Sequence, residues 1–69
     1  MNLPVLKQGA QGQFVRNLQG LLVANGAPIK VDGDFGPNTK SAVTVWQRHA
    51  GLSADGIVGP KTWRALLGA

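Results

Sequence analysis

The sequence predicts a small all-α domain, a three-helix bundle with two repeated D-G-x-x-G-P-x-T loop-to-helix units. The motif begins at Asp32 and again at Asp55, and 55 minus 32 gives an offset of 23 residues. Apolar residues at helical spacing precede the first motif and also separate the two copies. The 69 residues contain no cysteine, so a disulfide framework and a cysteine-based metal site are excluded. A chain of this length forms one domain, residues 1–69.

The first helix is expected at about residues 12–25. Its apolar face consists of Val15, Leu18 and Leu22. Gly20 within it costs on the order of 1 kcal/mol relative to alanine, so this helix depends on packing. Asn25-Gly26 is a typical helix end, because glycine accepts the left-handed conformation that closes the last turn.

The second and third helices are expected at about residues 37–50 and 60–67. Each follows a Gly-Pro dipeptide, and proline suits the first helical position because the amide that it lacks has no partner there. Gly36 and Gly59 are therefore the expected N-caps. One face of the second helix combines Ala42, Val43, Trp46 and Ala50. We expect Trp46 to lie in the core.

The repeated motif has the chemistry of a turn. Asp-Gly favours turns, because aspartate bonds the backbone ahead of it and glycine accepts positive φ. We assign a structural role to the repeated positions Asp32, Gly33, Gly36, Thr39, Asp55, Gly56, Gly59 and Thr62. Gln19 and Gln47 recur beside core positions of the first two helices, where each amide can reach loop backbone.

Composition argues against catalysis by this chain. Its only carboxylates are three aspartates within or next to the turns, and His49 is its only histidine. We therefore expect no catalytic residues, no metal site and no cofactor. The net charge of +4 suits an anionic partner, but the seven basic residues form no dense run. A small basic nucleic-acid-binding module and a protein-docking module stay open as alternatives.

The sequence gives little sign of membrane targeting. No apolar run approaches the roughly 20 residues that span a bilayer. Met1-Asn2-Leu3-Pro4 has no basic region ahead of an apolar stretch, so we identify no signal peptide in this chain. The protein is then either intracellular or a piece or mature form of a longer one.

The ordered motifs resemble the peptidoglycan-binding domain family over nearly the whole chain. The resemblance rests on G-x-x-G-x-x-V-x-x-L-Q from Gly9 and on both D-G-x-x-G-P-x-T motifs with their helices. It implies a three-helix bundle that binds peptidoglycan without catalysis and targets an attached or partner hydrolase to the wall. It also implies a monomer in the cell wall or outside the cell, exported within a longer precursor or delivered by phage. Many members have an aromatic residue after the glycine that ends the first helix, whereas Gly26 precedes Ala27-Pro28-Ile29.

The expected ligand contacts are polar residues near the motifs that have no evident core role, together with Trp63, for which a core position is favoured and a half-exposed position at the start of the third helix stays open. These are Asp34, Asn38, Arg48, Trp63 and Arg64. We expect the groove between the loop 31–38, the start of the third helix and the neighbouring face of the second. Whether it holds the glycan strand, the stem peptide or a secondary anionic polymer is left open by the sequence.

Overall fold

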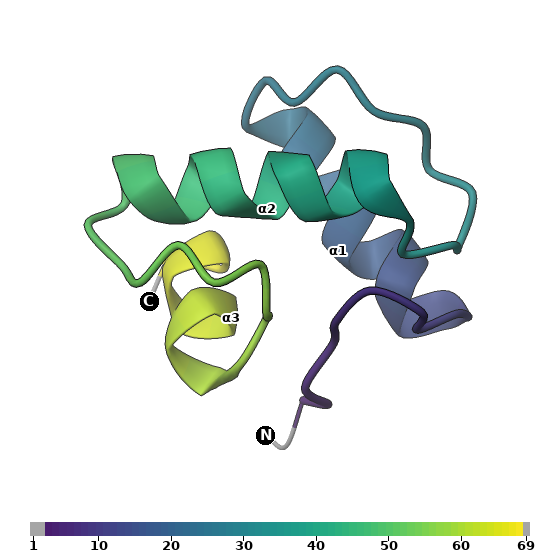
Figure 1. Ribbon diagram of the computed structural model, residues 1–69, viewed down its shortest axis with the longest axis horizontal. Coiled ribbons are helices and arrows are strands. Elements are labelled where there is room, and N and C mark those ends of the chain that lie inside the picture. The colour runs from purple at the N-terminus through teal and green to yellow at the C-terminus, as the bar shows by residue number, and fades with distance from the viewer. Residues whose placement is uncertain (1–2, 69) are drawn as a thin grey trace.

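The computed structural model describes residues 3–68 and contains three helices, α1 (Gln13–Ala24), α2 (Pro37–His49) and α3 (Pro60–Leu66). In Figure 1, α2 runs horizontally, α1 crosses it, and α3 lies beneath its C-terminal half. The predicted all-α, three-helix fold is confirmed, and each helix ends one residue before its expected end. None of these helices has the length and apolar character needed to cross a membrane.

Both Gly-Pro dipeptides start helices, as the sequence predicts. Pro37 and Pro60 are the first residues of α2 and α3. Their N-caps have nearly equal backbone angles, with φ and ψ of −100° and −167° at Gly36 and −102° and −167° at Gly59. The repeated motif therefore leads the chain into both helices through the same extended conformation.

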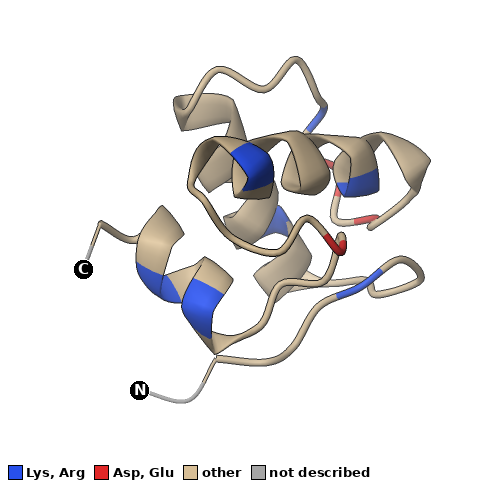
Figure 2. Cartoon of the chain, turned by 60° about the vertical axis from the view of Figure 1, so that its left-hand side comes forward, with Lys and Arg blue, Asp and Glu red and all other residues tan. Residues whose placement is uncertain are grey.

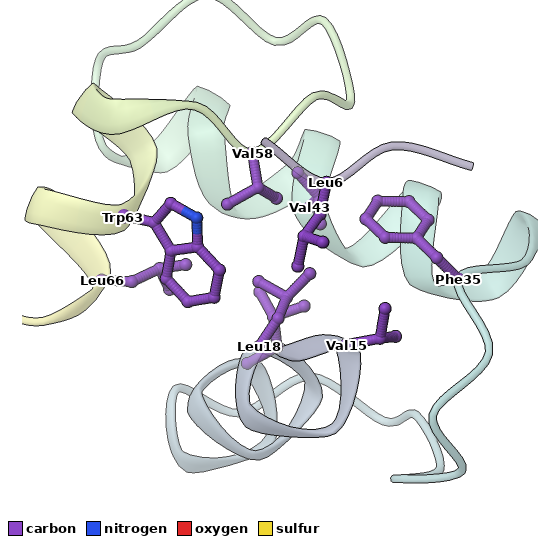
Figure 3. Close-up of a cluster of buried hydrophobic side chains, with 9 residues drawn as sticks. Leu6, Val15, Leu18, Phe35, Val43, Val58, Trp63 and Leu66 are labelled. Atoms are coloured by element: carbon purple, nitrogen blue, oxygen red, sulfur yellow. The ribbon is translucent and has the colours of Figure 1, made fainter. Parts of the chain in front are cut away.

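The core joins all three helices with the loops between them. Its buried apolar members are Leu6, Val15, Leu18, Leu22, Phe35, Val43, Val58, Trp63 and Leu66. In Figure 3 the indole of Trp63 reaches from α3 toward the centre of this cluster. Trp46 is only half-buried and packs against the cluster from outside. The expectation of a core Trp46 was therefore only partly right, and the fully buried tryptophan is Trp63.

The segment before α1 ties the two ends of the chain together. Leu6 and Val58 exchange backbone hydrogen bonds, with N–O distances of 3.0 Å from Leu6 N and 2.7 Å from Val58 N. The indole Nε1 of Trp63 donates to the carbonyl oxygen of Pro4 at 2.7 Å. Burial of Trp63 thus depends on a segment that is 59 residues away in sequence, and sequence patterns do not reveal such a contact.

Candidate functional site

A buried glutamine of α1 organises the first repeated loop. Gln19 Oε1 accepts hydrogen bonds from the backbone N–H groups of Asp32 and Gly33 at 3.0 and 2.9 Å. Its Nε2 donates to Asp32 Oδ1, to the Asp34 carbonyl and to Thr39 Oγ1 at 2.9–3.0 Å. We call this set the Gln19 clamp. It fixes the start of α2 against the middle of α1.

The second loop has an equivalent arrangement around Gln47 of α2. Gln47 Oε1 accepts from the Gly56 N–H at 3.0 Å. Its Nε2 donates to Asp55 Oδ1 at 3.1 Å, to the Ile57 carbonyl at 2.8 Å and to Thr62 Oγ1 at 3.1 Å. This Gln47 clamp fixes the start of α3 against α2. The structural roles expected for the aspartates and threonines of the motif agree with these bonds.

Hydrogen bonding to their own loops lowers the pKa of both clamp carboxyls. For Asp32 the main cause is the bond donated by the Asp34 amide, followed by the Gln19 side chain. For Asp55 the main cause is the Ile57 amide, with a smaller contribution from Gln47. A carboxyl with a lowered pKa that is committed to a turn is a poor general acid. These aspartates therefore hold the loops in shape.

The helix orientation set by the Gln19 clamp leaves a hollow of about 480 Å³ between α1 and α2. One side is formed by Leu22 and residues 25–29, at the end of α1 and in the loop that follows. The other side is a single face of α2, formed by Asn38, Ser41, Ala42, Val45, Trp46 and His49. These positions recur at helical spacing. We call this feature the α1–α2 hollow.

The hollow combines an apolar floor with a polar rim. Half-buried Trp46, Ile29 and Ala27 supply apolar surface, and Val45 is 51% exposed beside them. Asn38 and Ser41 are exposed at the rim. Concave, mainly apolar sites with a few polar groups are typical of small-molecule binding, so this is the candidate binding site.

The structure disperses the five contact residues expected from the sequence. Only Asn38 lines the α1–α2 hollow. Asp34, Arg48 and Arg64 are exposed outside it. Trp63 is 3% exposed with its indole N–H bonded to Pro4, so its assignment as a ligand contact is wrong. It is wrong because the N-terminal segment covers the ring.

The hollow also lies in a different place from the expected groove. The groove predicted from the sequence includes the 31–38 loop and the start of α3, whereas the hollow is lined by residues 25–29. The sequence did contain a signal for the hollow, because α2 carries two rows of residues. One row is buried and consists of Thr39, Val43 and Gln47. The other row is apolar, lines the hollow and consists of Ala42, Val45 and Trp46. A second apolar row on a helix whose first row already fills the core indicates a binding face.

Comparison with known families agrees with the motifs and the fold. Residues 11–66 match the family model described as a putative peptidoglycan binding domain. The chain belongs to this family. The peptidoglycan-binding domain is thus a non-catalytic module of the kind that occurs in cell-wall hydrolases such as amidases and spore cortex-lytic enzymes.

Curated relatives carry the same domain within longer chains. The domain is 46% identical over 65 residues to the zinc D-Ala-D-Ala carboxypeptidase of Streptomyces albus G, covering 88% of this chain and 25% of that protein. It is 44% identical over 68 residues to a probable N-acetylmuramoyl-L-alanine amidase of Bacillus licheniformis, covering 94% and 19%. The chain therefore spans a quarter or less of these two relatives.

Solved structures share the whole fold. The SleB N-terminal domain superposes with a TM-score of 0.92 at 41% identity, over 94% of this chain and 90% of that one. The endolysin of Burkholderia phage AP3 gives a TM-score of 0.90 at 44% identity, over 91% of this chain and 24% of that one. Both structures therefore share the fold of nearly the whole chain.

Proposed function

We propose that this domain holds peptidoglycan in the α1–α2 hollow. The observation that carries the proposal is the second row of α2, which places half-buried Trp46 in a hollow beside exposed Asn38. An aromatic side chain provides contact area at little cost in conformational entropy, and the asparagine provides a directional hydrogen-bonding group. The rest of the fold, above all the Gln19 clamp, keeps the two walls of the hollow in place.

Net charge gives a second, less specific component of binding. The Lys and Arg residues are spread over all three helices and the connecting segments rather than gathered on one face (Figure 2). Such a distribution attracts an anionic wall without selecting a particular group on it. Arg48, Arg64 and Asp34 are then peripheral contacts. Because the basic side chains do not gather on one face, their distribution also gives no support to nucleic-acid binding.

A single small module of this kind works best when tethered. The domain spans 25% and 19% of two curated relatives named as a carboxypeptidase and an amidase. The partner is then a hydrolase in the same or an associated chain, acting at the cell wall or outside the cell. Weak binding by the monomeric domain raises the local concentration of that hydrolase on its polymer.

Co-sedimentation with purified, insoluble peptidoglycan sacculi tests this function. The Ser41→Phe variant places a bulky ring in the hollow at an exposed helix position. Its matched control is Ser53→Phe, at an exposed position outside the hollow. We expect the parent and the control to sediment with the sacculi and Ser41→Phe to stay in solution, with circular dichroism confirming that all three are folded.

Salt separates the two components of binding. At about 1 M salt the Debye length falls to about 3 Å, so attraction between exposed charges is screened. We expect binding to weaken and yet persist, because contacts inside the hollow do not depend on charge. If the domain ignores sacculi but shifts duplex DNA with a steep salt dependence, the proposal is wrong and nucleic acid becomes the ligand.

A further inference from the structure

The walls of the α1–α2 hollow carry no Lys, Arg, Asp or Glu side chain among residues 3–68, and His49 is the one ionisable residue that lines them, although the chain has seven basic and three acidic residues. Peptidoglycan has two chemically different parts. The stem peptide carries ionised carboxylates and amines, and the glycan strand consists largely of neutral N-acetylated sugars. Moving an ionised group into a partly apolar hollow without a charged partner is costly. The walls therefore favour the neutral part of the polymer.

The polar groups at the rim match those of an N-acetylated sugar. The side chains of Asn38 and Ser41 make no hydrogen bond to any other residue within 3–68 and are exposed. Asn25 uses Nδ2 to donate to the Leu21 carbonyl at 2.8 Å, which leaves its Oδ1 as an acceptor. Amide and hydroxyl groups both donate and accept, as sugar hydroxyls and the acetamide group require.

The apolar groups match the remaining parts of such a sugar. A pyranose ring has a C–H face, and the acetamide ends in a methyl group. Trp46 is half-buried against the core, so its ring is held in place while part of it stays accessible in the hollow. Ile29 and Val45 border the same space with branched aliphatic side chains. A fixed aromatic surface beside aliphatic groups is a suitable seat for a sugar face and a methyl group.

The loop that follows α1 adds peptide groups with unused hydrogen-bonding capacity. Residues 28–31 run outside any helix, and no backbone hydrogen bond within 3–68 involves them. Pro28 and Ile29 of this stretch line the hollow. Backbone N–H and C=O groups require partners, and an acetamide is a single peptide-like group that offers both.

From these observations, and resting on the proposed function, we infer that the hollow holds the glycan strand through an N-acetylated hexosamine unit. The acetamide lies against Ile29 and the free backbone of the 28–31 stretch, and the sugar face lies on Trp46. Asn38 and Ser41 bond the hydroxyls at the rim. The stem peptide then projects away from the hollow, toward the exposed basic side chains outside it.

The test is a titration of the ¹⁵N-labelled domain with three soluble probes. Chitotetraose supplies β-1,4-linked N-acetylglucosamine, cellotetraose has the same linkage without acetamide groups, and a synthetic stem tripeptide represents the other arm of the polymer. We expect chitotetraose to shift the amide resonances of residues 25–29 and of the α2 face around Trp46. Cellotetraose should shift them far less, and the tripeptide should leave them in place.

Two variants make the titration specific. Asn38→Ala should weaken chitotetraose binding by about three- to tenfold, the equivalent of one hydrogen bond. Asn17→Ala, an exposed asparagine on α1 outside the hollow, should bind as the parent does. Equal binding by both variants would overturn the assignment of Asn38.

The outcome also separates this inference from the proposed function. If the tripeptide alone shifts the hollow residues while Ser41→Phe still abolishes sacculus binding, the hollow is the binding site and the glycan assignment is wrong. If sacculi bind equally well to Ser41→Phe, the site itself is elsewhere and the proposed function of the hollow fails first.

Discussion

At the scale of single residues, two buried glutamines do most to specify this fold. Gln47 is fully buried, and its amide meets three groups of the loop before α3 and the Thr62 hydroxyl in the first turn of α3. Gln19 meets four groups of the loop before α2 and the Thr39 hydroxyl in the first turn of α2. No buried side-chain nitrogen or oxygen among residues 3–68 lacks a partner. A buried polar network that is fully satisfied defines one arrangement of its loops, because any other leaves polar groups unpaired.

Removing one clamp amide should therefore be costly. Gln47→Leu keeps the size of the side chain but leaves the Gly56 N–H and the Thr62 hydroxyl without their partner. We expect the free energy of unfolding to fall by about 2–4 kcal/mol, since each unsatisfied buried group costs about 1–3 kcal/mol. Urea denaturation measures the loss. Gln8→Leu, at an exposed position, is the control, and equal stability of both variants would contradict the role of the clamp.

The clamp carboxyls predict how stability depends on pH. Both Asp32 and Asp55 have a folded pKa below the ordinary value of 3.8, which they regain on unfolding. Their contribution is therefore complete above pH 3.8 and is lost as pH falls through the lower, folded pKa. We expect the parent's Tm to drop as the pH falls below about 4. The Asp32→Asn/Asp55→Asn double variant should be less stable at pH 7, and its Tm should fall less steeply than the parent's in acid. If its Tm falls as steeply as the parent's, these two carboxyls are not the cause of the loss of stability.

At the scale of elements, the helices differ in what maintains them. α3 has only seven residues, and isolated helices shorter than about 12–15 residues are marginal in water. It persists because the Gln47 clamp fixes its first turn and because Trp63 and Leu66 are buried. α1 is longer and contains an exposed glycine, Gly20, in its interior. The loops, in contrast, need glycine where φ is positive.

Two glycines should thus respond in opposite ways to the same substitution. Gly20→Ala should raise the free energy of unfolding by about 1 kcal/mol, since the added Cβ meets no atom within 4 Å. Gly56→Ala should lower it by at least about 1–2 kcal/mol, because φ is +74° and the Cβ would lie 3.0 Å from Lys40 Cγ. Thermal denaturation of the two variants provides the comparison, and a shift in the same direction for both would refute the argument.

At the scale of the whole molecule, the two tryptophans differ in burial, since Trp63 lies in the core whereas Trp46 is half-buried and packs against it. Trp63→Phe should lower the free energy of unfolding by about 1–3 kcal/mol, through lost packing and the lost bond to Pro4. Trp46→Phe should cost less than about 1 kcal/mol, because that ring is only partly buried. Chemical denaturation ranks the two, and the reverse order would return Trp46 to the core.

The sequence could predict features that depend on residues close together in the chain, and it could not predict features that depend on distant ones. The helix starts at Pro37 and Pro60 were predictable because Gly-Pro acts on adjacent residues. The role of Gln19 could be predicted because Gln47 recurs at the equivalent position of the second helix. The helical pattern favoured a buried Trp63, but the bond from its indole to Pro4 was not predictable, because the two residues are 59 positions apart. The hollow was missed because its floor joins the 25–29 loop to the second row of α2, and only the angle between two helices brings these together.

The bond between Pro4 and Trp63 also has a consequence for the order in which the chain folds. The Gln47 clamp joins residues 8–15 positions apart and the Gln19 clamp joins residues 13–20 positions apart, whereas the Pro4 bond spans 59. Closing a longer loop costs more entropy. We expect both clamps to form before the rate-limiting barrier and the N-terminal segment to dock after it. In stopped-flow experiments Gln47→Leu should then slow refolding, whereas Trp63→Phe should chiefly accelerate unfolding.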